Sequence, residues 1–118
     1  MAQTKVKPGL LTGGFDIITA LTPASTITVD YDGAQIFTLT PTSNTTLNIT
    51  DPVIGISKAF IITGTGNSYT ITLNVGGSAN TFNKIAGDYN DTNATKNLIQ
   101  IMCVGATEFW YTISQIAS

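Results

Sequence analysis

Apolar and polar residues alternate one by one along most of this chain, and the pattern is clearest between Ser68 and Val75. One side of an extended chain there carries only apolar groups, from Tyr69, Ile71, Leu73 and Val75. The other side carries hydroxyls and amides, from Ser68, Thr70, Thr72 and Asn74. A period of two predicts a β-strand with one buried face and one solvated face.

Six further segments show the same alternation or a short apolar run between turn residues. They are Thr26–Tyr31, Gln35–Thr40, Thr45–Thr50, Ser57–Thr63, Asn97–Val104 and Glu108–Gln115. Phe60, Ile61 and Ile62 are consecutive, which predicts a strand covered on both faces. Asn80–Ile85 is a candidate short strand, and Gly87–Lys96 is predicted to be an exposed loop. No segment repeats its apolar positions with helical spacing.

The residues between these strands favour turns. Asp32-Gly33 suits a tight hairpin, Pro41–Asn44 and Gly64–Asn67 break the chain, and Gly105-Ala106-Thr107 is expected to close a last hairpin. Short strands at such regular intervals predict an all-β protein, an antiparallel β-sandwich or a small jelly-roll-like barrel. We expect one β domain over residues 16–118, preceded by an extended arm over residues 1–15 that is rich in Gly and carries Lys and Pro.

Charge is scarce, at 10% of the 118 residues, with a net charge of −2 and neither Arg nor His. The polar surface must instead come from 21 Thr, 9 Asn and 7 Ser. Without a basic patch, nucleic acid is not an expected partner. No apolar run is long enough to span a membrane and no signal peptide is recognisable, so we expect a soluble, leaderless product of the cytoplasm. The single cysteine, Cys103, is predicted to be buried in a strand.

The chain offers few groups for catalysis. Without histidine there is neither a conventional triad nor an imidazole metal site. The acid pairs Asp30/Asp32 and Asp88/Asp91 are interpreted as turn and loop residues. The oxygen-rich segment Asp88–Asn93 leaves Ca²⁺ binding open as an alternative, although it lacks the Gly and Glu of an EF-hand loop. We therefore predict no catalytic residue, no cofactor and no metal ion.

Two aromatic residues on the last strand, Trp110 and Tyr111, are candidates for surface contact. They could stack on a sugar, or they could fill a core or a subunit interface. Gly33–Thr50 and Ala59–Asn83 contain no charged residue. Since charges normally protect exposed strand edges, we expect these edges to be closed in a barrel or covered by neighbouring copies, and we favour assembly.

Several of these segments together resemble a β-rich module of bacteriophage virion proteins. The similar segments are Phe60-Ile61-Ile62, Tyr69–Leu73, Phe82, Thr92–Asn97, Leu98–Ile101 and Gly105–Tyr111. The module occurs in tail fibres, head fibres and capsid decoration proteins, and the resemblance covers about half of the chain. Its usual ending has Asp-Gly-Thr before the aromatic pair, where this chain has Gly105-Ala106-Thr107-Glu108.

The resemblance implies a non-enzymatic virion protein, commonly a homotrimer, and its small size favours capsid decoration or a head fibre. The arm is expected to dock on the major capsid protein or another virion protein through Lys5, Lys7, Leu10, Leu11 and Phe15. A tail-fibre or receptor-binding module that touches host surface glycans is the alternative. A non-viral adhesin or surface-layer fragment is a third possibility, for which a secretion signal would be expected.

Overall fold

The computed structural model describes residues 18–76 and 82–116, and the elements in these ranges are all β-strands. Nine strands follow one another along the chain. They are β1 (Ile18–Ala20), β2 (Thr26–Asp30), β3 (Ile36–Leu39), β4 (Thr45–Thr50), β5 (Ser57–Thr63), β6 (Ile71–Val75), β7 (Phe82–Ala86), β8 (Lys96–Cys103) and β9 (Phe109–Gln115). The all-β class and seven of the predicted strands are confirmed, although β6 begins at Ile71 rather than at Ser68.

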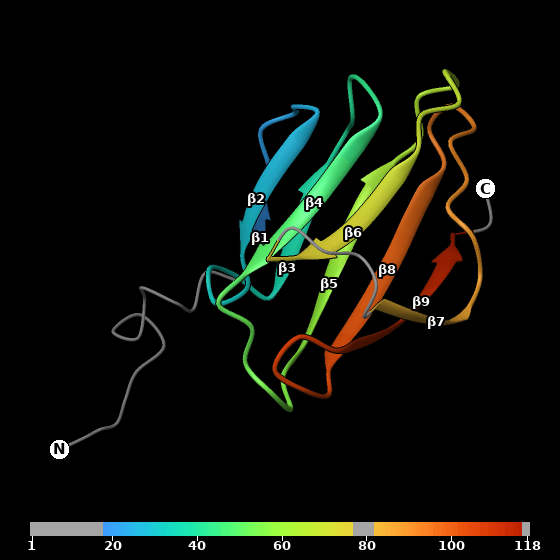
Figure 1. Cartoon of the computed structure of the whole chain (residues 1–118). Coiled ribbons are helices and arrows are strands. Elements are labelled where there is room, and N and C mark those ends of the chain that lie inside the picture. The colour runs from blue at the N-terminus through green and yellow to red at the C-terminus, as the bar shows by residue number, and fades with distance from the viewer. Residues whose placement is uncertain (1–17, 77–81, 117–118) are drawn as a thin grey trace, which may run out of the picture.

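Consecutive strands in the first two thirds of the chain alternate between two facing sheets (Figure 1). The odd-numbered strands β1, β3 and β5 pair in parallel in a six-stranded sheet. The even-numbered strands β2, β4 and β6 pair in parallel in a three-stranded sheet. The chain therefore winds as a coil in which each turn stacks on the one before, and the arrangement is β-solenoid-like.

This coil corrects the prediction of an antiparallel sandwich or jelly-roll-like barrel built from hairpins. Asp32 and Gly33 do form a turn, in which the Gly33 amide donates to the Asp30 carbonyl at 2.9 Å. The turn leads from β2 in one sheet to β3 in the other, so it joins two layers rather than two neighbouring strands. Alternation of apolar residues fixes which face of a strand is buried but does not fix which strand lies beside it.

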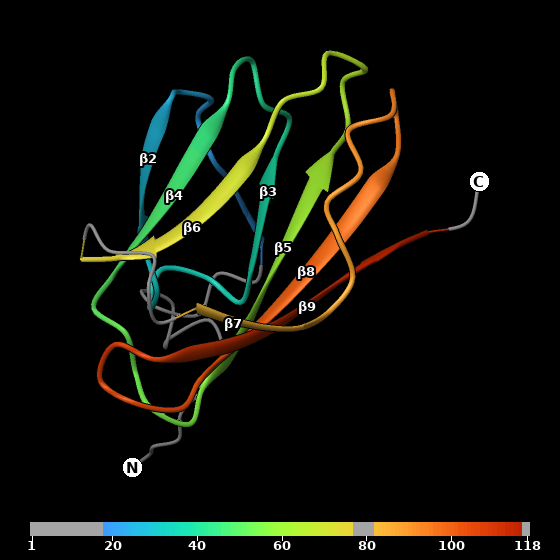
Figure 2. The ribbon, with the colours of Figure 1, turned by 45° about the vertical axis from the view of Figure 1, so that its right-hand side comes forward.

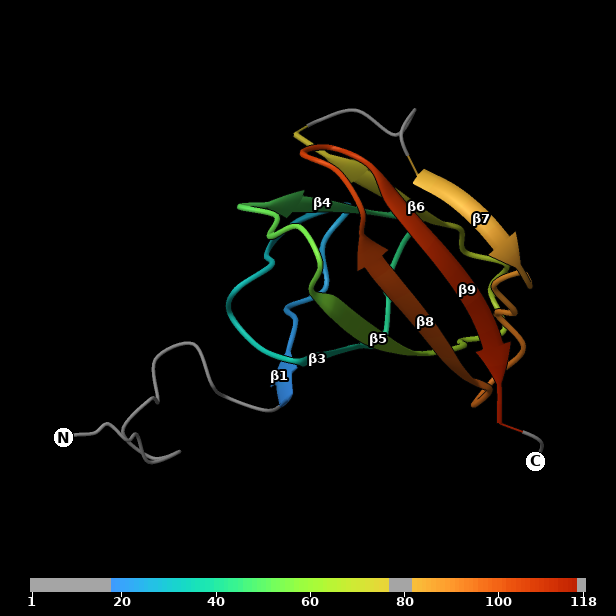
Figure 3. The same ribbon diagram turned by 90° about the horizontal axis from the view of Figure 1, so that it is seen from below.

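The last third of the chain ends the coil with a change of direction. β8 lies antiparallel to β5, β9 lies antiparallel to β8, and β7 pairs in parallel with β9 at the sheet edge (Figures 2 and 3). The predicted hairpin at Gly105-Ala106-Thr107 is confirmed, because the Val104 amide donates to the Glu108 carbonyl at 2.9 Å across it.

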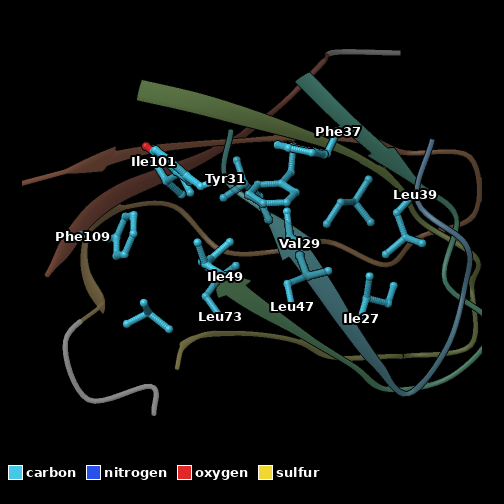
Figure 4. Close-up of a cluster of buried hydrophobic side chains, with 14 of the residues drawn as sticks. Ile27, Val29, Tyr31, Phe37, Leu39, Leu47, Ile49, Leu73, Ile101 and Phe109 are labelled. Carbon is cyan, nitrogen blue, oxygen red and sulfur yellow. The ribbon is translucent and has the colours of Figure 1, made fainter. Parts of the chain in front are cut away.

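The core fills the space between the two sheets (Figure 4). Each sheet contributes rows of inward side chains, with Ile27, Leu47 and Leu73 in one row and Val29, Ile49 and Val75 in the next. Aromatic rings fill the six-stranded side, where Phe37 stacks on Phe60 with ring centroids 5.4 Å apart. Cys103 is fully buried in this core, as predicted.

The charge-free segments supply both interior strands and edge strands. β3 lies between β1 and β5, and β4 lies between β2 and β6. These interior strands need no edge protection, whereas β6 lies wholly within the charge-free segment Ala59–Asn83 and is an edge strand. That neighbouring copies cover such uncharged edges therefore stays a prediction.

Candidate functional site

The acidic residues of the described chain do not gather into a catalytic or metal-binding cluster. Residues 18–76 and 82–116 contain no group of three or more His, Cys, Asp or Glu side chains that could hold a metal ion. Asp30 accepts a hydrogen bond from the Asp32 amide at 3.1 Å, as expected of a turn residue. Asp88 pairs with Lys84 on the surface.

Large apolar side chains gather on the outer surface of the six-stranded sheet, among polar outward residues such as Gln100 and Thr112. We call it the outer apolar face and define it by the outward residues Ile18, Ile36, Ala59, Ile61, Ile85, Leu98, Met102, Trp110 and Ile116. Five of these are large and substantially exposed, at 59% for Ile18, 61% for Ile85, 40% for Met102, 44% for Trp110 and 68% for Ile116. Large exposed apolar patches are uncommon on monomeric proteins and mark interaction surfaces.

Charge is nearly missing from this face. Lys96 is the one charged residue at the outward positions of the six strands, and its ammonium donates to the Thr63 hydroxyl at 2.9 Å. The face therefore has no electrostatic attraction for phosphate groups or acidic surfaces. Its chemistry suits an equally apolar partner.

A groove of about 500 Å³ crosses the face. Ile36, Ala59, Ile85, Met102 and Trp110 supply its apolar walls. Ile54 and Ile56, which precede β5, are also exposed.

The two aromatic residues predicted to make surface contacts are separated by the strand pleat. Trp110 points outward, and its indole Nε1 donates to Glu108 Oε2 at 3.0 Å, which fixes the ring on the face. Tyr111 is half-buried on the opposite side and lies edge-on to Phe82 with ring centroids 6.2 Å apart. Of these two residues, only Trp110 has a side chain that a partner can contact on this face.

Behind the groove, the buried residue Lys58 anchors the loop between β2 and β3. It is 6% exposed, and its ammonium donates to the Ala34 carbonyl at 2.7 Å and to Gln35 Oε1 at 2.8 Å. The same ammonium lies 5.6 Å from the centroid of the Tyr31 ring. All three groups that contact the ammonium are uncharged, and no carboxylate of the described residues pairs with it.

A second, polar site surrounds Asp91, where the loops 64–70 and 87–95 meet. Its carboxylate accepts hydrogen bonds from the Thr65 amide (3.1 Å) and hydroxyl (2.8 Å), the Asn67 amide (3.2 Å), the Tyr69 amide (2.9 Å) and the Tyr89 hydroxyl (2.6 Å). Desolvation raises the pKa of this carboxyl, but the hydrogen bonds together outweigh it and hold the pKa at about 2. Burial, and then the bond to Asp91, raise the pKa of Tyr89.

The sequence showed part of these sites. Apolar residues at both odd and even positions, as in Ala59–Ile62 and Leu98–Met102, were the signal for a strand with two apolar faces, and the structure leaves the outer one uncovered by any described element. Three of the four residues that bond to Asp91 are 22 to 26 residues away, beyond the reach of a local pattern, and only Tyr89 is close in the sequence. The predicted docking residues Lys5, Lys7, Leu10, Leu11 and Phe15 lie outside the described residues.

Comparison with protein-family models, curated proteins and solved structures finds no match to this chain. The described residues also contain no helix of the length and apolar character needed to cross a membrane.

Proposed function

We propose that this protein is a non-enzymatic structural component of a bacteriophage virion, a capsid decoration or head-fibre protein that assembles with copies of itself on the capsid surface. The outer apolar face is the observation that carries the proposal. Its occupant is a second copy of the chain, and the assembly is a homotrimer. The arm of residues 1–15 holds the assembly to the major capsid protein or another virion protein.

The size of the face suits a stable contact between copies. Strands about 4.8 Å apart and about 3.3 Å per residue give the six-stranded sheet a flat projection of roughly 500 Å². The accessible area of protruding side chains exceeds this projection, and a typical specific interface buries ~800 Å² per partner. The face carries Lys96 and, beside Trp110, the carboxylate of Glu108, which have opposite charges. In a trimer each copy packs one part of this face on a different part of the next copy.

Solution mass tests the assembly directly. The wild-type protein should have three times the chain mass of 12.4 kDa, or 37.2 kDa, by light scattering coupled to size-exclusion chromatography. Met102→Glu places a charge beside Trp110 on the outer apolar face and should give the single-chain mass. Thr28→Glu is the matched control, since Thr28 is exposed on the opposite sheet, and it should remain trimeric. A monomeric wild type, or a Met102→Glu protein that stays trimeric, would refute assembly through this face.

The virion role needs its own test. Particles should carry many copies of the protein per capsid on a stained gel, and particles without it should lose resistance to heat. Deletion of residues 1–14 should abolish binding to the capsid while the far-UV spectrum of the β domain stays unchanged. Retained capsid binding by this truncated protein would contradict the docking role of the arm.

Exposure of Trp110 favours a second candidate, a tail-fibre or receptor-binding module that touches host surface glycans. Its ring is 44% exposed and held in place by Glu108, as a stacking platform would need. This function predicts few copies per particle and loss of adsorption in a Trp110→Ala virion. Unchanged adsorption would remove the candidate.

A further inference from the structure

A polar cleft of about 490 Å³ lies beside Asp91, between the loop that joins β5 to β6 and the loop that joins β7 to β8. Figure 1 shows these loops together, at the opposite end of the strands from the β8–β9 hairpin. The walls of the cleft are made of two tyrosines, one glycine and small polar residues, namely Gly66, Ser68, Tyr69, Tyr89, Asn90, Asp91, Thr92 and Asn93. The cleft is separate from the groove at Trp110.

Hydrogen bonds hold both walls in place. On one wall, Asp91 fixes the loop 64–70 through four of the bonds described above, and the fifth, from Tyr89, lies within its own loop. On the other, the fully buried Asn97 accepts from the Asn90 amide at 2.9 Å and donates to the Asn90 carbonyl at 2.8 Å. The loops also approach closely, because a Cβ on Gly64 would lie 2.3 Å from the Thr92 carbonyl oxygen. The cleft is therefore preformed, as ligand sites usually are.

The backbone at this cleft is strained. Ser68 and Ala94 have φ angles of 61° and 67°, and Asp51 is the only other non-glycine residue of the described chain with a positive φ. Such conformations cost free energy and persist where the surrounding structure enforces them, which is common at ligand sites. Both lie in the two loops that form the cleft.

The lining groups select a neutral, hydroxyl-rich ligand. The Asp91 carboxylate is occupied by its five internal donors, and its charge disfavours an anion. Within the described ranges, the side chains of Ser68, Thr92 and Asn93 make no hydrogen bond, so they are available to donate and accept. The Tyr69 ring adds an apolar surface against which the ring of a sugar can lie.

We propose that this cleft binds a neutral saccharide, with Asn93, Thr92 and Ser68 as hydrogen-bonding residues and Tyr69 as the stacking residue. Preorganised loops reduce the ordering cost of binding, and a small polar ligand still makes few contacts, so single sugar units should bind with a Kd of about 1 mM. The inference does not depend on assembly through the outer apolar face or on a virion location.

Amide NMR of the ¹⁵N-labelled protein tests the site. Galactose, glucose, mannose and N-acetylglucosamine are titrated separately into the Met102→Glu protein, which keeps the test independent of assembly. If Met102→Glu does not give a monomer, the wild-type protein is used. At least one sugar should shift the amides of residues 66–69 and 90–93 in a saturable way.

Three variants separate this cleft from other contacts. Asn93→Ala and Tyr69→Ala should each weaken binding about tenfold, because each removes one contact while the Tyr69 backbone bond to Asp91 is kept. Trp110→Ala should leave the affinity unchanged. The proposal is overturned if none of the four sugars shifts these amides, if the shifts cluster at Trp110, or if both cleft variants bind as well as the parent protein.

Discussion

Substitution of Asp91 by asparagine offers a direct measure of how strongly one carboxylate ties two loops together. The amide keeps the shape of the side chain but replaces one oxygen with a donor group. If that group takes the place of Oδ2, it faces three donors, the Thr65 hydroxyl and the amides of Asn67 and Tyr69. Donors that lose their acceptor and stay shielded from water are expensive. We therefore expect the loop 64–70 to loosen.

The magnitude follows from the pKa of the carboxyl. Hydrogen bonds lower this pKa from the ordinary value of 3.8 to about 2 against the opposing effect of desolvation. At about 1.4 kcal/mol per pKa unit this equals roughly 2 kcal/mol, and solvent screening at a partly exposed loop reduces it to about 1–2 kcal/mol. Because the folded-state pKa is depressed, this stabilisation is complete above pH 3.8 and is lost as the pH falls through about 2.

Urea unfolding followed by far-UV circular dichroism is the appropriate assay. At pH 7, Asp91→Asn should lower the free energy of unfolding by about 1–2 kcal/mol with an unchanged m-value. The fall in stability between pH 5 and pH 2 should be smaller in the variant than in the wild type. Asp88→Asn is the control, because Asp88 is an exposed partner of Lys84, and it should change stability by less than about 0.5 kcal/mol. Equal effects of the two substitutions would refute the reasoning.

Three further outcomes are expected. Gly87→Ala should cost about 1–3 kcal/mol more than Gly55→Ala, because both glycines have φ of 88° but only at Gly87 would the new Cβ lie 1.8 Å from the Ile113 carbonyl oxygen. Equal urea midpoints for the two variants would contradict this. Burial raises the pKa of the Cys103 thiol, so Ellman's reagent should react with it only after unfolding, and rapid reaction of the native protein would count against the buried position. Phe60→Ala should destabilise by about 3–5 kcal/mol through loss of a fully buried ring, and a loss below about 1 kcal/mol would exclude a packed core there.

The strands were readable from the sequence, but their partners were not. Alternation at Thr26–Tyr31 and Thr45–Thr50 identified the inward residues because side-chain direction depends only on the local backbone. Pairing depends on where each turn sends the chain. The connection through Asp32 and Gly33 is as short as a hairpin loop, yet it crosses between layers. A coil is indicated instead by apolar residues that recur at similar intervals, because such residues stack in successive turns. Here Ile18 lies beside Ile36, and Ile36 lies beside Ala59.

The candidate surfaces were accessible to sequence reasoning to different degrees. Trp110 is exposed and Tyr111 faces the other side of the strand, as the pleat requires, so contact with a partner through Trp110 stays a prediction. Met102 and Ile36 share the outer apolar face with Trp110 only because β3, β5, β8 and β9 lie in one sheet. Three of the residues that bond to Asp91 lie in the loop before β6, so β6 and β7 separate them from Asp91 in the sequence. No short sequence motif predicts a contact over this distance.

The alternation of strands between two sheets also determines how the molecule opens. β1 and β2 each have one neighbouring strand, whereas β3, β4, β5 and β8 each have two. Backbone amides of the first turn should therefore exchange with solvent by local fraying, at a small fraction of the global unfolding free energy. Exchange should become slower inward along the coil and be slowest where β5 meets β8, since that pair joins the parallel turns to their antiparallel cap.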